Sequence, residues 1–403
     1  MLNDFDFSPV NSWMESYISE EKFVGCSLLV ALDNDIIHKH YSGFRNTEKV
    51  HPFDFESVVR IYSMTKPITS LALMILEDQG KVDLNTPLDE FIPSFSNSYA
   101  LIDGAKDLSQ VKKVSPPTLV HLLTHTSGLS YAFNDSLVGK AYAEKSRISR
   151  QEDKISGKSV NRMDLQKLCD AIAEFPLSFT PGRKWEYSMS IDVIGRVIEI
   201  VSGKNLSDFI TENILEPAEM HDTGFFLKGD MKKRMAECYV KHSEKDSYSH
   251  YLDTPDDYER ENVNLFLGGS GLLSTIFDYF KFTKIISNDG MYNKTKIISP
   301  HGIQKLTTNM LASDIATIGP KDFAFMPTTG MGHGLGGSVI IDPQESFSSS
   351  KGDYSWGGMA STYFWIDRVN KISVIFLTQL IPSGSYPNRP ELKKLVRKCL
   401  NLK

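Results

Sequence analysis

The chain has 403 residues, of which 41% are hydrophobic and 23% are charged, with a formal net charge of −6. This composition is ordinary for a globular protein, and the length allows a full core in one large domain or two lobes. The acidic balance and the lack of a dense Lys/Arg run speak against nucleic-acid binding, and no apolar run approaches the ~18 residues of a membrane-spanning helix.

Residues 1–7 are acidic and lack the basic and then apolar stretch of a secretory signal, so a cytoplasmic location is expected. The cysteines show no paired spacing, which predicts reduced, buried thiols and no disulfide framework. They are Cys26, Cys169, Cys238 and Cys399. The ten histidines have no metal-type spacing, so we expect no metal and no organic cofactor.

The N-terminal part predicts a helix and then a hairpin. Apolar residues recur at helical spacing over residues 10–20. Residues 26–32 and 36–41 predict two strands joined by a turn. After a loop, residues 61–76 start with small polar residues and become almost wholly apolar, which predicts a helix buried on every side. Gly80 is its expected C-terminal cap.

The middle of the chain, from about residue 81 to 320, predicts helices and long polar loops, whereas the end returns to strands. Helices are expected at residues 119–123, 164–174, 191–201 and 391–400, and strands at residues 337–342, 361–367 and 372–378.

We therefore expect an α/β (α+β) fold in which both termini meet in one antiparallel sheet, with the buried helix packed on it. Residues 1–85 and 321–403 would form the sheet lobe, and residues 86–320 a mostly helical lobe. The active site would lie in the cleft between the lobes.

Ser63 and Lys66 lie in the first turn of the buried helix, three residues apart, so their side chains can meet. The same spacing occurs at Ser19/Lys22, Ser109/Lys112 and Ser348/Lys351. Those pairs sit in polar surroundings, where a solvated pair is the ordinary explanation. Only Ser63 opens a long apolar helix, where a desolvated amine can lose its proton and act as a base. The helix N-terminus would favour a developing oxyanion.

Residues 61–67, Ile-Tyr-Ser-Met-Thr-Lys-Pro, resemble the active-site element of the serine β-lactamase-related hydrolases. This group contains class C β-lactamases, family VIII esterases, D-amino-acid peptidases and some acyltransferases. Further segments carry the resemblance over most of the chain: residues 87–88, 122–129, 181–182, 187–188, 216–217, 220–225 and 269–272. The resemblance implies a β-lactamase/transpeptidase-like fold and an acyl-enzyme on Ser63.

In this group a Tyr-x-Asn or Tyr-Ser-x motif brings a tyrosine to the nucleophile, and here the motif falls on Tyr187. Held near the lysine, its phenol would act as a phenolate base and return the proton to the leaving group. The alternative is a buried structural tyrosine. Met189 departs from the β-lactamase pattern, because methionine cannot hydrogen-bond the side-chain amide of a lactam as asparagine would.

The Lys-Thr-Gly element of β-lactamases is absent from the sequence. Trp356, Gly357, Gly358 and Met359 precede the strand at residues 361–367, and this segment resembles the family VIII esterases. The glycines would let substrate approach the backbone closely. The resemblance implies substrate binding by Trp356, Gly357 and Gly358, and an oxyanion hole formed by the N–H groups of Ser63 and Met359. A glycine-rich strand start without function is the alternative.

Two further residues are expected to be structural. His125 would support the helical lobe, and Asp192 would cap a helix or pair with another polar group. The sequence as a whole favours a carboxylesterase acting on short-chain esters. A β-lactamase, a D-amino-acid peptidase or amidase, an acyltransferase and a silent scaffold are the alternatives. The expected partner is a small-molecule ester or amide. Loops near residues 131–160 and 240–265 are expected to shape the acyl pocket.

Overall fold

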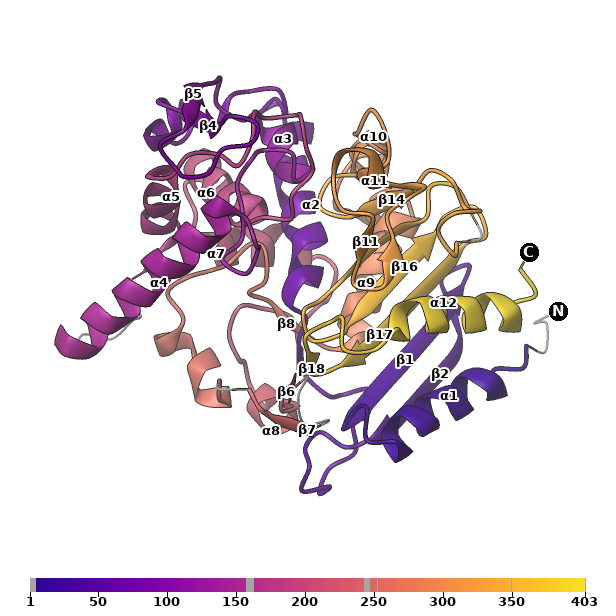
Figure 1. Cartoon of the computed structure of the whole chain (residues 1–403). Coiled ribbons are helices and arrows are strands. Elements are labelled where there is room, and N and C mark those ends of the chain that lie inside the picture. The colour runs from indigo at the N-terminus through magenta and orange to yellow at the C-terminus, as the bar shows by residue number, and fades with distance from the viewer. Residues whose placement is uncertain (1–4, 157–162, 243–246, 252, 349, 403) are drawn as a thin grey trace.

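The computed structural model describes residues 5–156, 163–242, 247–251, 253–348 and 350–402. Its centre is an antiparallel sheet of seven strands, built from both ends of the chain (Figure 1). The strand order is β13 (Met331–His333), β14 (Ser338–Ile340), β15 (Tyr354–Gly357), β16 (Tyr363–Asp367), β17 (Ile372–Thr378), β1 (Gly25–Leu32) and β2 (Asp35–Gly43).

The N-terminal hairpin extends the sheet formed by the C-terminal strands. Its turn places Asp33 and Asn34 at φ values of 50° and 68°, a left-handed conformation that short polar side chains tolerate. On its other edge β1 pairs with β17, with Cys26 opposite Thr378 at one end. The expectation that both termini meet in one antiparallel sheet is therefore confirmed.

Helices cover both faces of the sheet. Leu28 and Val30 of β1 enter a core with α1 (Ser8–Ser19) and α12 (Asn388–Cys399). Leu29 and Ala31 face the opposite core, where α9 (Ile276–Ser287) packs against β1, β16 and β17. Because both faces are covered, the strand is a continuous apolar run instead of an alternating one.

The buried helix predicted from residues 61–76 is α2 (Thr65–Asp78), preceded by a 3-10 turn over Tyr62–Met64. Every residue from 61 to 76 is buried except Ser63. The helix packs against α6 (Ser190–Ser202), α7 (Leu206–Ile210) and α10 (Pro300–Leu306). On the sheet itself the helix α9 packs against β1, β16 and β17, whereas α2 shares a hydrophobic core with residues of several sheet strands. The expected packing of α2 on the sheet stays a prediction. Gly80, at φ 69°, follows the helix end as predicted.

The middle of the chain holds most of the remaining elements. The other helices are α3 (Leu119–Leu123), α4 (Leu137–Ser156), α5 (Leu165–Ala173), α8 (Met231–Arg234) and α11 (Ile315–Ile318). Short strands outside the main sheet are β3 (Val59–Arg60), β4 (Tyr99–Leu101), β5 (Val111–Lys113), β6 (Tyr239–His242), β7 (Ser247–His250), β8 (Leu273–Ser274), β9 (Met291–Tyr292), β10 (Thr295–Lys296), β11 (Asp322–Phe323), β12 (Met326–Pro327) and β18 (Leu380–Ile381).

Two local expectations are corrected. Residues 137–156, expected as part of a loop, form the helix α4, which extends away from the rest of the molecule (Figure 1). Trp356 and Gly357 lie inside β15, a strand that the sequence did not reveal. The division into lobes of residues 1–85 with 321–403 and residues 86–320 stays a prediction; α9, inside the second range, packs on the sheet. Within the described ranges, no helix combines the length and apolar character that crossing a membrane requires.

We predict that Phe376→Ala lowers the free energy of unfolding by about 3–5 kcal/mol, because it leaves a cavity between the sheet and α1. Phe376 is 0% exposed, and its ring contacts those of Trp13 and Phe23. Urea unfolding followed by fluorescence measures the change. Val369→Ala, at a position that is 72% exposed, is the control and should stay within about 0.5 kcal/mol. Equal effects of the two substitutions would contradict this account of the core.

Candidate active site

Ser63 is held in place by hydrogen bonds of the residues on both sides of it. Tyr62 has a φ of 44°, a strained conformation for a bulky residue that the surrounding structure must impose. The Ile61 N–H donates to the Leu272 carbonyl at 3.2 Å, and the Leu272 N–H donates to Thr65 Oγ1 at 3.1 Å. The Ser63 side chain is therefore presented from a turn that β8 and its neighbours fix.

The structure brings the three predicted catalytic side chains together. Tyr187 Oη lies 2.6 Å from Ser63 Oγ, and Lys66 Nζ lies 3.3 Å from the same oxygen. The Lys66 Nζ is also 4.7 Å from the centre of the Tyr187 ring. A hydroxyl in this position can lose its proton to the tyrosine when that is a phenolate, or to the lysine when that is a neutral amine.

Lys66 is 0% exposed, so its amine must find partners inside the protein. Besides Ser63, its Nζ donates to the Gly269 carbonyl at 2.8 Å and to Tyr131 Oη at 3.0 Å. Three oxygen acceptors match the three N–H bonds of an ammonium. Sequence reasoning missed Tyr131; its only signal was its place two residues after the motif at residues 122–129.

Asp192 supports Lys66 indirectly, through Gly269. The carboxylate accepts a hydrogen bond from the Gly269 N–H at 2.8 Å, and the carbonyl of the same glycine accepts from Lys66. Burial raises the pKa of Asp192, while Lys66 and the Gly269 N–H oppose that rise. A Cβ on Gly269 would lie 2.6 Å from Asp192 Oδ2, so only glycine fits there. Asp192 thus pairs with a backbone group of the protein, the Gly269 N–H, in line with the structural role expected for it.

Two buried histidines pack behind the site. The His125 ring lies 4.9 Å from the Tyr187 ring and 5.4 Å from the His333 ring, and His125 Nδ1 accepts from the Ser188 N–H at 3.3 Å. Burial, reinforced by the neighbouring His333 and Lys66, lowers the pKa of His125 well below its usual range. Burial likewise lowers the pKa of His333 to about 4. His125 therefore supports the Tyr187 loop in particular.

Residues 356–359 lie against the turn that carries Ser63. A Cβ on Gly358 would come within 2.4 Å of the Ile61 carbonyl, and the Met359 side chain packs in a cluster with Tyr62. A Cβ on Gly357 would meet the Arg389 guanidinium at 2.4 Å. Other groups of the protein thus occupy the positions that side chains at Gly357 and Gly358 would take. That these two glycines bind substrate stays a prediction, and only their backbone groups could do so.

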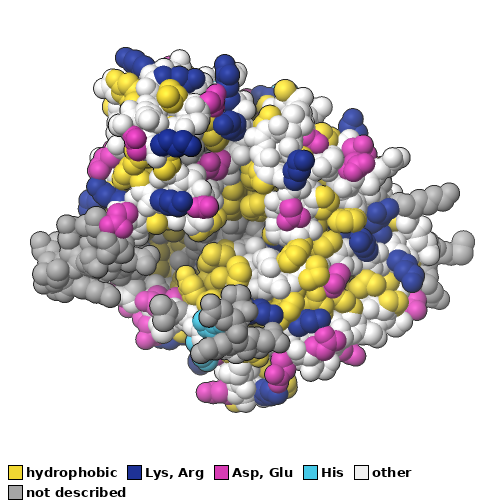
Figure 2. Space-filling model, in the orientation of Figure 1, with side chains coloured by type: hydrophobic (Ala, Val, Ile, Leu, Met, Phe, Trp, Pro, Cys, Tyr) yellow, Lys and Arg dark blue, Asp and Glu magenta, His cyan; other side chains and the backbone are white. Residues whose placement is uncertain are grey.

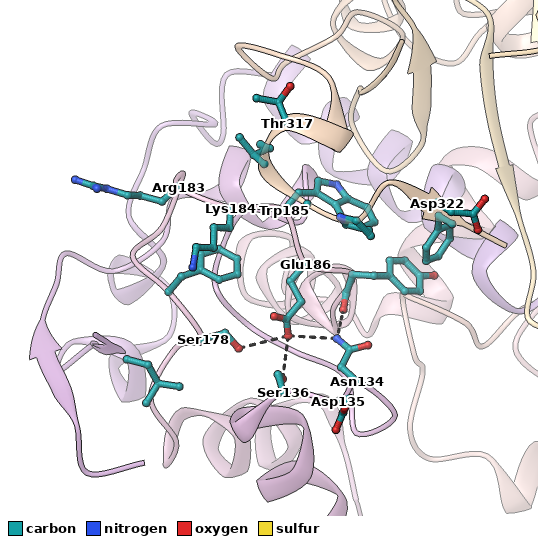
Figure 3. Close-up of a pocket in the computed structure, with 17 residues that line it drawn as sticks. Asn134, Asp135, Ser136, Ser178, Arg183, Lys184, Trp185, Glu186, Thr317 and Asp322 are labelled. Atoms are coloured by element: carbon teal, nitrogen blue, oxygen red, sulfur yellow. Dashed lines mark hydrogen bonds between the residues drawn. The ribbon is translucent and has the colours of Figure 1, made fainter. Parts of the chain in front are cut away.

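A pocket of about 820 Å³ opens beside Tyr187 (Figure 3). Trp185, Tyr187 and Phe323 give it an aromatic wall. Glu186, which also lines it, accepts hydrogen bonds from the amide of Asn134 and from the hydroxyls of Ser136 and Ser178. Of the expected pocket-shaping loops, residues 134–136 line this pocket, whereas residues 317–323 were not anticipated. Figure 2 shows hydrophobic side chains gathered in the hollow between the two parts of the molecule.

The seven-stranded sheet and the Ser-Lys-Tyr cluster together define a protein of the β-lactamase/transpeptidase-like fold. The computed structure matches the solved structure of EstCE1, a hydrolase with promiscuous acyltransferase activity, with a TM-score of 0.78 over 97% of this chain and 98% of that chain, at 22% identity.

A model of the Beta-lactamase family matches residues 10–398, so the chain belongs to this family. Protein Rv1367c of Mycobacterium tuberculosis (strain ATCC 25618 / H37Rv) is 30% identical over 88% of this chain and 86% of its own length. Esterase EstB of Burkholderia gladioli is 26% identical over 91% of this chain and 88% of its own length.

We predict that the protein loses stability as the pH falls from about 6.5 to about 4, in part through His333. In this window His333 binds a proton in the unfolded chain but stays neutral in the folded protein. The free energy of unfolding therefore falls by about 1.4 kcal/mol for each pH unit. Urea unfolding at a series of pH values should give a shallower slope for His333→Asn than for the wild type. His51→Asn, at an exposed position, should keep the wild-type slope; identical slopes for all three proteins would refute the assignment.

Proposed function

We propose that the protein is a serine hydrolase that acts through an acyl-enzyme on Ser63, and that it is a carboxylesterase for esters with a short acyl chain. The observation that carries the proposal is the position of Ser63 Oγ, 2.6 Å from Tyr187 Oη and 3.3 Å from Lys66 Nζ. Ser63 is also the one member of its segment, residues 61–76, that is not buried, so a substrate can reach it.

In the proposed acylation step, Ser63 Oγ attacks the ester carbonyl and passes its proton to Tyr187, acting as a phenolate. Lys66 stabilises the phenolate, since its ammonium lies over the ring. The N–H groups of Ser63 and Met359 hold the oxyanion. Tyr187 then protonates the leaving alcohol.

Deacylation repeats these steps with water. A water molecule takes the place of the departed alcohol and gives a proton to Tyr187, with Lys66 again beside the phenol. Attack on the acyl carbonyl forms a second oxyanion in the same hole. Collapse of this intermediate breaks the bond to Ser63 Oγ, which recovers its proton from Tyr187, and the carboxylic acid leaves.

Two features favour esters over β-lactams. Trp356 and the glycines after it stand where a β-lactamase has Lys-Thr-Gly, so the lysine and threonine that grip the lactam carboxylate are missing. Trp356 is buried against the rings of Tyr187 and Phe323 and offers an apolar surface there. Met189 replaces the asparagine that would bind a lactam side-chain amide. Both changes remove polar contacts that a neutral ester does not need.

The aromatic wall beside Tyr187 supports an apolar leaving alcohol. A pocket of about 820 Å³ is within the usual range for small-molecule sites, and it opens next to the group proposed to protonate the alcohol. The same place would hold an acceptor alcohol if the acyl group were transferred instead of hydrolysed. The solved structure of EstCE1 is described as a hydrolase with promiscuous acyltransferase activity, so acyl transfer is the second candidate.

The first test is labelling by a fluorophosphonate probe, which reacts with an activated serine. We expect the wild-type protein to take one label and Ser63→Ala to take none. Ser19→Ala is the matched control, because Ser19 has the same spacing to a lysine but is exposed; it should label like the wild type. A wild-type protein that takes no label and cleaves no ester would rule out the hydrolase.

Substrate assays then separate the enzyme classes. Short-chain p-nitrophenyl esters should be cleaved faster than a chromogenic cephalosporin or D-alanyl amides. Added alcohol that diverts the acyl group into a new ester would identify acyl transfer. Cephalosporin turnover above ester turnover would reverse the preference for an esterase.

We predict that Tyr187→Phe lowers kcat for ester hydrolysis by roughly 10²–10⁴-fold, the usual range for a positioned acid or base. Tyr142→Phe makes the same chemical change at another buried tyrosine, whose ring packs against Phe175, and it should keep wild-type activity. Steady-state kinetics on one p-nitrophenyl ester compare the variants. Near-normal kcat in Tyr187→Phe would assign the base to Lys66 alone.

A further inference from the structure

Arg389, in the first turn of α12, is a buried cation without a buried anion. Its side chain is 4% exposed, and among the described residues no carboxylate lies within ion-pair distance of it. Burial lowers the pKa of this guanidinium to about 10. A buried charge without a counter-ion is costly, so the position of Arg389 calls for an explanation other than pairing.

The hydrogen-bond partners of Arg389 are backbone carbonyls beside the candidate oxyanion hole, and its guanidinium also lies 5.6 Å from the centre of the Tyr363 ring. Its Nη2 donates to the Gly358 carbonyl at 2.9 Å and to the Thr362 carbonyl at 3.3 Å. The guanidinium occupies the place of a Gly357 side chain, since a Cβ there would lie 2.4 Å from Nη2. Glycine at position 357 is thus needed for Arg389 to reach the strand.

The Gly358 carbonyl and the Met359 N–H belong to one planar peptide group. A hydrogen bond that a cation donates to the carbonyl draws electron density from the nitrogen, and it thereby makes the N–H a stronger donor. The same bond fixes the plane of the peptide and so the direction of the N–H. Both effects act at the place where the proposed mechanism develops negative charge.

We propose that Arg389 is a positioning residue that orients and polarises the Gly358–Met359 peptide as the second donor of the oxyanion hole. The inference rests on the proposed function, since it assigns a role within that same site. Arg389 acts through the peptide and does not touch the substrate.

The test compares Arg389→Met with Asn388→Ala. Asn388 is the preceding residue, is equally buried, and donates to the Ser361 carbonyl at 3.2 Å in the same loop. Its loss removes a side-chain hydrogen bond without touching the Gly358–Met359 peptide. Circular dichroism first establishes that the variants are folded. Arg389→Lys, which keeps the charge and one donor, is the second variant and should show a smaller loss.

Two readouts separate an effect on the oxyanion hole from loosened packing. The first is the affinity for phenylboronic acid, which forms a tetrahedral adduct on the serine. For Arg389→Met, kcat/KM for an ester and boronate affinity should fall in parallel by about tenfold, with KM nearly unchanged, because a weakened donor costs less than the 10²–10³-fold of a deleted one. The second is the infrared stretch of a 13C-labelled acyl carbonyl in the acyl-enzyme, which should move to higher frequency.

Asn388→Ala should leave both readouts at wild-type values. A folded Arg389→Met with unchanged boronate affinity and carbonyl frequency would overturn the inference, as would equal losses in Arg389→Met and Asn388→Ala. If Arg389→Met does not fold, Arg389→Lys decides by the same readouts. A wild-type protein that forms no boronate adduct would reject the proposed function itself. If the wild type forms the adduct and the Arg389 variants bind the boronate as tightly as the wild type, only the inference about Arg389 is rejected.

Discussion

Lys66 places an amine in the buried interior, on a helix whose apolar side chains belong to a hydrophobic core, and the arrangement around it follows from the cost of doing so. An ammonium without partners in such a place is destabilised by several kcal/mol. Here oxygens of Ser63, Tyr131 and Gly269 surround the nitrogen. They come from three segments, the most distant of which lies 203 residues from Lys66 in the chain. Burying this one amine therefore fixes how the turn before α2 meets the loops that surround it.

The support continues behind these oxygens. Asp192 holds Gly269 by its N–H, and His125 packs on Tyr187. On the opposite side of Ser63, Arg389 holds the carbonyl of Gly358. The cluster around Ser63 is thus held by buried polar groups on more than one side. Hydrogen bonds of this kind hold reactive groups in a fixed orientation, which explains why residues with no contact to a substrate matter at this site.

Local sequence patterns were sufficient for much of the fold. The N-terminal hairpin, α2 and the strands β16 and β17 could be predicted from apolar periodicity and turn residues. Both signals depend only on residues that are close together in the sequence. Errors arose where burial came from distant elements. Residues 137–156 are polar yet helical, and β15 has only four residues and ends in a glycine. That α9 packs on the sheet cannot be read from its own sequence, because this helix is apolar on most sides.

The sequence by itself determined the candidate nucleophile, because Ser63 and Lys66 are joined by one helical turn and need no other part of the chain to meet. The motif resemblance added Tyr187 and the segment at residues 356–359. Only the tertiary structure placed Tyr131, Gly269, Asp192 and Arg389 at the site. Their partners are 31 to 203 residues away in the chain. Contacts at such separations depend on the path of the whole backbone, which no local periodicity encodes.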